Sequence, residues 1–267
     1  MTHTGVRQKL FSDLDSDLVV KAPLLLNLAI RREYQSTMTR TIILLSAFVL
    51  AIFSTGCGKG ADAARLELAQ MNIPFTERAF IDTVRQGDTS ALALFLDAGM
   101  STATKTYDGQ PALSVAALSN QADALKLLLI RGADLNGRDK HGGTALMTAC
   151  WKGNLETVNM LLAEKADRNA QAANGMTALM FAAWEGHAEV VEALLEKGAD
   201  PGISDKDGWT ALMRATFKGR TNTAKVLLER GADAGVESND QKTALTIAED
   251  RRLPEMVQLL KSVGATK

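Results

Sequence analysis

The sequence predicts an all-α solenoid of stacked helix–turn–helix units with protruding turns. Three sets of marks carry this prediction, because each recurs every 33 residues along most of the 267-residue chain. Self-similarity at a period of this size is typical of repeat architectures, whose units bury an apolar face only against their neighbours. The marks are an Ala-Leu dipeptide beginning at residues 112, 145, 178, 211 and 244, an Ala-Asp dipeptide beginning at 133, 166, 199 and 232, and the glycines Gly87, Gly153, Gly186 and Gly219.

One unit shows how the residues produce two short helices. A first helix begins after Thr177, whose hydroxyl can accept a hydrogen bond from a free amide of the first turn. Gly186 ends that helix, because glycine adopts the left-handed conformation without steric cost. After the second helix, a loop reaches the Asp207-Gly208 pair, which suits a tight turn. The second helix carries its apolar residues at helical spacing, namely Val190, Val191, Leu194 and Leu195.

The two ends of the array are expected to act as caps. At the N-terminal end, Thr76 is predicted to be an N-cap, with Phe75 and Phe80 placed for a hydrophobic staple. At the C-terminal end, Lys261 replaces the second leucine of the pair that other units carry. More polar ends are expected because a terminal unit has a neighbour on one side only.

Composition narrows the function. Apolar residues make up 46% of the chain, and its 30 Lys and Arg nearly balance its 31 Asp and Glu. The apolar fraction excludes a disordered chain. The charge balance leaves no global basic charge that would favour binding to nucleic acid. No metal-spaced histidine pair, phosphate loop or nucleophile elbow appears. We therefore predict a non-enzyme with no cofactor, no metal and no small-molecule substrate, in which Cys150 is a small buried residue.

The period and its marks resemble those of the ankyrin repeat. The best copy is Asp207-Gly208-Trp209-Thr210-Ala211-Leu212, together with Gly186-His187-Ala188-Glu189-Val190-Val191 from the preceding unit. One tetrapeptide departs from the family pattern, because Thr-Ala-Leu-Met replaces Thr-Pro-Leu-His, and methionine is expected to fill the space by packing. The resemblance covers six units, near residues 73–105, 106–138, 139–171, 172–204, 205–237 and 238–267.

The resemblance implies that the turn tips and the exposed face of each first helix form a concave surface that binds another protein. All three tryptophans of the chain fall at these positions, which vary between units. Aromatic residues are favoured at protein interfaces because they bury a large area. At 33-residue steps, Trp151, Trp184 and Phe217 form an aromatic column, and Lys152, Glu185, Lys218 and Arg251 form a charged column beside it. The alternatives are that the aromatic column packs between neighbouring helices, and that the charged column is a solvated face. The predicted partner-binding residues are Tyr107, Leu118, His141, Trp151, Lys152, Met176, Trp184, Glu185, Trp209, Phe217 and Lys218.

The N-terminal part of the chain is interpreted as a leader. An apolar run over residues 42–53 follows Arg40, and it has the length of a signal-peptide core rather than of a membrane span. The run is followed by Ser54-Thr55-Gly56-Cys57, which resembles the lipobox of bacterial lipoproteins. This resemblance implies that Cys57 is lipidated. It also implies that the protein is sorted to the outer membrane rather than retained in the inner membrane, because glycine rather than aspartate follows Cys57. An uncleaved membrane anchor and a cleaved, secreted form are the alternatives.

The leader divides the chain into segments. Met38 lies just before Arg40, the charged residue at the start of the leader. Residues 1–37 are therefore interpreted as an unstructured upstream extension, and residues 38–57 as a signal peptide or membrane anchor. Residues 58–72 are expected to be a spacer that contains a short helix. We therefore expect a non-enzymatic protein–protein interaction module, anchored on the periplasmic side of a bacterial envelope. A structural scaffold, or a regulator of a periplasmic oxidative-stress enzyme, is the alternative function.

Overall fold

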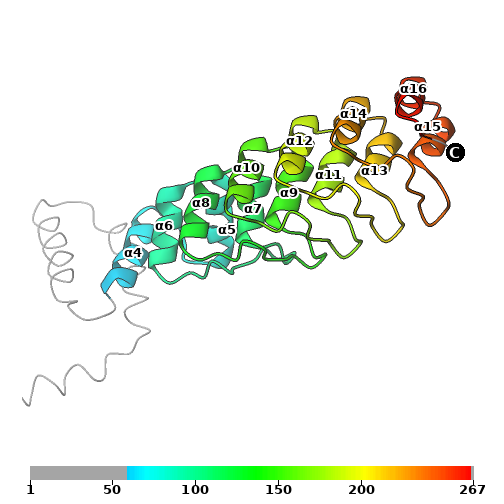
Figure 1. Ribbon diagram of the computed structural model, residues 1–267. Coiled ribbons are helices and arrows are strands. Elements are labelled where there is room, and N and C mark those ends of the chain that lie inside the picture. Colours follow the sequence, from blue (N-terminus) through cyan, green and yellow to red (C-terminus); the bar gives the residue numbers. More distant parts are fainter. Residues whose placement is uncertain (1–58, 266–267) are drawn as a thin grey trace, which may run out of the picture. The chain divides into compact units, whose positions relative to one another are not determined.

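Short helices stacked in a row make up residues 59–265, the part of the chain that the computed structural model describes (Figure 1). Within that range there are thirteen helices and no strand, with one isolated antiparallel bridge between Lys105 and Pro111. The helices are α4 (Lys59–Gln70), α5 (Glu77–Gln86), α6 (Thr89–Asp97), α7 (Ala112–Leu118), α8 (Ala122–Ile130), α9 (Ala145–Lys152), α10 (Leu155–Ala163), α11 (Ala178–Glu185), α12 (Ala188–Glu196), α13 (Ala211–Phe217), α14 (Thr221–Glu229), α15 (Ala244–Asp250) and α16 (Pro254–Ser262).

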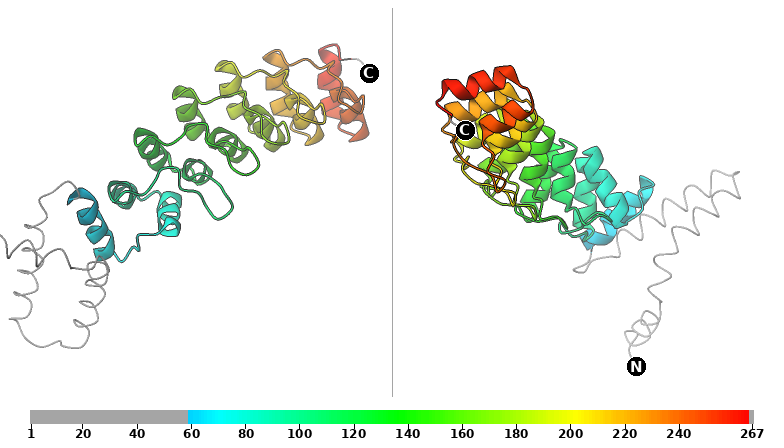
Figure 2. Two further views of the ribbon diagram at one scale, coloured as in Figure 1. Left: turned by 90° about the horizontal axis from the view of Figure 1, so that it is seen from below. Right: turned by 90° about the vertical axis from the view of Figure 1, so that its right-hand side faces the viewer.

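The helices after α4 form pairs that stack side by side. The first helix of a pair contacts the first helices of its neighbours, as α9 does with α7 and α11, and the second helix α12 likewise contacts α10 and α14. Figure 1 shows the second helices along one edge of the row and the long loops along the other, and Figure 2 shows that successive pairs follow one another. The predicted all-α solenoid of stacked helix–turn–helix units with protruding turns is therefore confirmed.

The hydrophobic core runs along the row, between the two layers of helices. Val191 and Leu194 of α12 are fully buried, and so contribute the apolar face predicted for a second helix. Met147, Met180 and Met213, the last residues of the three Thr-Ala-Leu-Met tetrapeptides, are at most 3% exposed. Burial of one such side chain stabilises the fold by about 1.5–3 kcal/mol. The prediction that methionine fills this space by packing is confirmed.

Threonine hydroxyls cap the start of every first helix except α7, which begins after Pro111 without a side-chain cap. Thr177 accepts the amide of Met180 at 3.4 Å, and Gly186 ends α11 in the left-handed conformation with a φ of 91°. Thr76 accepts the amide of Ala79 at 3.2 Å at the start of α5. A cap of this kind contributes about 1 kcal/mol, because it satisfies an amide that has no partner within the helix. The same cap is present at Thr144, Thr210 and Thr243.

Left-handed backbone positions keep the 33-residue period even where glycine is missing. Asn120, Lys165 and Arg252 have φ angles of 54°, 67° and 56°, and each stands where other units have a helix-ending glycine. The left-handed conformation costs a non-glycine residue about 1–2 kcal/mol. The stacking of neighbouring units, rather than local preference, therefore determines the backbone at Lys165 and Arg252, whereas asparagine adopts this conformation more readily.

Helix α4 belongs to the folded array, which corrects the interpretation of residues 58–72 as a spacer. Leu68 of α4 is fully buried in the same core as the helix pairs. Arg65 on the same helix donates a hydrogen bond from Nη2 to the carbonyl of Ala98, at 3.2 Å. The short helix was predicted correctly, but its apolar residues cover the end of the first pair, because that pair has no unit before it to bury its core.

Aromatic packing closes the same end of the array. Phe75 and Phe80, the two residues predicted to form a staple, both pack on Phe95 of α6 with ring centroids 5.7 Å apart. The guanidinium of Arg65 lies 4.7 Å from the centroid of the Phe75 ring. The N-terminal cap therefore combines a cation–π contact with one stacked pair of rings, Phe75 on Phe95, and one edge-to-face pair, Phe80 on Phe95.

The predicted leader lies outside the described residues, with Met38, the apolar run over residues 42–53 and the lipidation site Cys57. Among the helices of residues 59–265, none has both the length and the hydropathy needed to cross a membrane.

Candidate functional site

A side chain at the base of four of the long loops holds the loop in shape, whereas the loop between α10 and α11 has Ala172 at this position. Asp139 accepts the backbone amides of His141 at 2.7 Å and of Gly143 at 2.8 Å. These bonds close the turn locally, so the loop needs no strand pairing to keep its conformation. Thr106, Asp205 and Ser238 hold the equivalent position in their own loops.

The loops are also bonded to one another. The amide of Ala173 donates to the carbonyl of His141 in the preceding loop, at 2.8 Å. Because these bonds repeat along the row, the loops form a hydrogen-bonded edge and do not move independently of one another. Equivalent bonds join Lys206 to Asn174 and Asn239 to Asp207.

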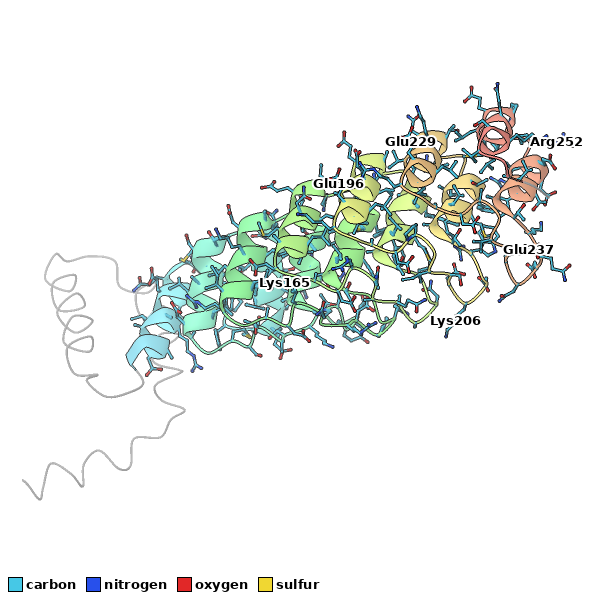
Figure 3. All side chains as sticks on the ribbon, in the orientation of Figure 1. Lys165, Glu196, Lys206, Glu229, Glu237 and Arg252 are labelled. Atoms are coloured by element: carbon cyan, nitrogen blue, oxygen red, sulfur yellow. The ribbon has the colours of Figure 1, made fainter. Side chains whose placement is uncertain are left out.

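Two edges of the array can be told apart in Figure 3. Lys206 and Glu237 lie on the loops, whereas Glu196 and Glu229 lie on the second helices at the opposite edge. We call the surface formed by the loops and the exposed residues of the first helices α7, α9, α11, α13 and α15 the loop-side face. It holds the columns in which the partner-binding residues are predicted.

Within the described helices, a further column of side chains ties four of the helix pairs to the pair before, and only the last pair, with Leu253 at this position, lacks the bond. His187 places Nε2 3.2 Å from the carbonyl oxygen of Trp151, at the end of α9. Asn154 donates in the same way to the carbonyl of Ala117, at 2.8 Å. These bonds satisfy carbonyls at the ends of the first helices. His187 is therefore structural, as predicted, and equivalent bonds are made by Gln121 and Arg220.

A groove of about 410 Å³ opens on the loop-side face. Three of the predicted binding residues line it, Leu118 from α7, His141 from a loop and Trp151 from α9. Met147 and Phe181 add apolar surface. Residues from successive pairs therefore come together in one concavity whose apolar lining carries a few polar groups, the usual character of a binding site.

Sequence reasoning missed Phe181 as a groove residue. It lies three positions before Trp184 on α11, so the two side chains share one face of that helix. The helical spacing of two large aromatic residues was the available signal. Met147 was predicted to pack in the core, and its 3% of exposed surface adds to the groove.

Trp151 is the most exposed of the three tryptophans, with 44% of its surface accessible. Its indole Nε1 donates to Oε1 of Glu185 on the next first helix, at 3.0 Å. The ammonium of Lys152 lies 4.3 Å from the centroid of its ring. These two contacts fix the orientation of the indole and leave much of its surface open beside the groove.

Three of the other predicted aromatic residues pack against one another. Trp184 and Phe217 are stacked with ring centroids 5.8 Å apart, and Trp209 meets the edge of Phe217 at 5.4 Å. All three are only partly exposed. We call these three residues the aromatic cluster. It matches the packing alternative for part of the column, whereas Trp151 remains open.

A buried ion pair contacts two rings of the aromatic cluster. The carboxylate of Asp205 is 1% exposed and accepts Nε of Arg214 at 2.8 Å, with a second short contact from Nη2 of the same guanidinium. The guanidinium also lies 4.9 Å from the ring centroid of Trp209 and 5.6 Å from that of Trp184. One charged pair therefore joins a loop base, a first helix and two aromatic rings.

The remaining predicted residues differ in exposure. Tyr107 is fully exposed at the tip of its loop, and Lys218 is exposed with its ammonium 4.6 Å from the Trp184 ring. Met176 was expected on the exposed face, but it is 9% exposed and packs in the core, which corrects that expectation. The carbonyl of Met176 accepts the amide of Ala172 and so closes the turn. Its flexible side chain fills space in the hydrophobic core.

Cys150 is fully buried on α9. Burial raises the pKa of its thiol well above the ordinary value, because desolvation disfavours the thiolate. The prediction of a small buried residue is confirmed. Within residues 59–265, no group of three or more His, Cys, Asp or Glu side chains is placed to hold a metal ion.

Comparison with known protein families agrees with this geometry. The model of the family described as ankyrin repeats, in three copies, matches residues 80–172, 113–205 and 195–267. These overlapping matches begin in α5 and reach the last residue of the chain. A search of curated proteins gave no significant match.

Proposed function

Because the chain belongs to the ankyrin-repeat family, whose members generally mediate protein–protein interaction, we propose that it binds a partner protein through its loop-side face without catalysing a reaction. The groove beside Trp151 is the observation that carries this proposal. It combines an exposed tryptophan with an apolar concavity, and such anchors supply most of the binding energy at protein interfaces.

Rigidity supports the same proposal. The loops are bonded to one another through backbone groups, such as Ala173 to His141, and the helix pairs are joined by side chains such as Asn154. A surface ordered before binding loses less conformational entropy when the partner docks. The mechanism is therefore presentation of a preformed surface, and the indole of Trp151, held by Glu185, is the anchor.

Affinity capture from an envelope extract tests this function. We expect Trp151→Ala in the full-length chain to lower the recovery of a specific partner by roughly tenfold or more, as truncation of an interface anchor does. The matched control is Ile130→Ala, because Ile130 is 70% exposed on the second helix α8, away from the loop-side face. A partner that is lost with Ile130→Ala and kept with Trp151→Ala would place binding on the other face.

A structural scaffold is the second candidate function. The aromatic cluster favours it, because Trp184 and Phe217 stack on each other and so stiffen the row. On this alternative the partner uses another face, and Trp151→Ala changes capture no more than the control does. The two functions are thus separated by the same experiment.

Tethering to a bacterial envelope, facing the periplasm, is the second part of the proposal. It rests on the apolar run over residues 42–53 and on the lipobox resemblance at Cys57. Mass spectrometry of the mature N-terminus is expected to find a lipidated Cys57, and Cys57→Ala is expected to abolish fractionation with membranes. Retention of residues 38–56 would instead indicate an uncleaved anchor, and an unmodified, cleaved N-terminus would indicate secretion.

A further inference from the structure

Three carboxylates on the loop-side face are engaged by the protein itself. Glu185 accepts the indole N–H of Trp151 at 3.0 Å. Asp250 accepts Nζ of Lys242 at 2.7 Å, and this bond raises the pKa of that lysine. Asp205 is buried against Arg214, as described above. The negative charge of these three carboxylates is therefore used within the fold.

Three cations on the same face are placed differently. Lys152, Lys218 and Arg251 are exposed, and none of them forms an ion pair within residues 59–265. Each lies over an aromatic ring, at 4.3, 4.6 and 4.4 Å from the centroids of Trp151, Trp184 and Phe217. A ring orients a cation without cancelling its charge, so the donors on its outer side stay available.

These cations follow the period of the array. They occupy one column at residues 152, 218 and 251, so Lys218 and Arg251 stand one unit apart and Lys152 stands two units before Lys218. Packed helices lie about 8–10 Å apart, and an extended chain advances about 3.3 Å per residue. An extended segment lying along the column advances about three residues per unit, so it would meet Lys218 and Arg251 with side chains about two or four residues apart, which point to the same side of the segment.

We propose that the partner docks through an extended acidic segment, an inference that rests on the proposed function. An apolar side chain of that segment enters the groove beside Leu118 and Trp151, and carboxylates further along it pair with Lys218 and Arg251. Lys152 pairs with a carboxylate next to the anchor. Single cations spaced by a whole unit suit separate carboxylates, whereas a phosphate group favours several donors that converge on it.

A library of random peptides of about ten residues, long enough to span three units, tests the proposal against the full-length chain. We expect the selected peptides to be enriched in Asp and Glu beside an apolar residue and to lose binding to the Trp151→Ala variant. Neutral or basic peptides that still depend on Trp151 would overturn the acidic partner and leave the proposed function standing. No selected peptide at all would also overturn the extended acidic segment alone, whereas peptides indifferent to Trp151→Ala would contradict both.

Charge variants sharpen the test. Replacing Lys152 and Lys218 together by Gln is expected to weaken a selected acidic peptide by roughly tenfold at low salt, the sum of two exposed ion pairs. The matched control is Lys126→Gln with Lys197→Gln, which removes the same charge from exposed positions at the second helices. Equal losses in the two double variants, or equally tight binding of a single-stranded oligonucleotide, would show non-specific attraction of anions and would overturn the proposal.

Discussion

Trp151 on α9 donates its indole N–H to the carboxylate of Glu185 on α11, across 3.0 Å and one unit of the array. The bond joins two columns whose residues were predicted to bind a partner. It holds the indole in place without burying it, since Trp151 stays 44% exposed. A side chain can thus be fixed by its neighbours and still face outward, which is the condition for a preformed anchor.

Trp184 and Trp151 are expected to differ in their effect on stability. Trp184→Ala removes a ring that is stacked on Phe217 and partly buried, so we expect the free energy of unfolding to fall by about 2 kcal/mol. Trp151→Ala removes one exposed hydrogen bond and one exposed cation–π contact, and is expected to cost less than about 1 kcal/mol. Urea unfolding followed by circular dichroism measures both. Equal losses would mean that Trp151 is also a packing residue.

Asp205 is expected to be the most sensitive carboxylate of the array. Asp205→Ala leaves the guanidinium of Arg214 without its buried partner, and breaking such a pair costs about 3–5 kcal/mol. Asp207→Ala is the control, because its carboxylate is 79% exposed and 3.7 Å from the same guanidinium. The control is expected to change the free energy of unfolding by about 0.5 kcal/mol or less. Similar urea midpoints for the two variants would refute the structural role of Asp205.

Cys150 is expected to make stability fall at alkaline pH. The folded state raises the pKa of the thiol, so its contribution is fully present below the unfolded pKa of about 8.5 and is lost as the pH rises above that value. The loss is up to about 1.4 kcal/mol per pH unit while only the unfolded chain ionises. The measurement is the urea midpoint between neutral and alkaline pH, compared with that of Cys150→Ala, which should lack this part of the slope.

Lys165 is expected to be a site where glycine stabilises the protein. Its φ of 67° is left-handed, and Lys165→Gly relieves a cost of about 1 kcal/mol, partly offset by the greater freedom of glycine in the unfolded chain. We expect a net gain of a few tenths of a kcal/mol. Lys197→Gly is the control, because Lys197 has a φ of −85° and should lose stability. A loss at both positions would argue against backbone strain at Lys165.

Much of the fold follows from local rules that the sequence displays directly. Thr177 begins a helix because its hydroxyl satisfies a free amide, and Gly186 ends it because glycine tolerates a positive φ. The same marks recur at one period, so the prediction for one unit extends to its neighbours. The spacer interpretation of residues 58–72 failed at this level, because nothing local shows that Leu68 is buried by the first helix pair.

By itself, the sequence determined the all-α solenoid, its helix caps and the columns that vary between units. The tertiary structure decided which members of those columns are exposed. Trp151 is open while Trp184 and Phe217 stack, and Met176 is buried, although all of them lie in columns predicted to be variable and exposed. Exposure depends on how far one unit is offset from the next and on which side chain fills the gap between them. Both are properties of packed neighbouring units, so the sequence of a single repeat does not determine them.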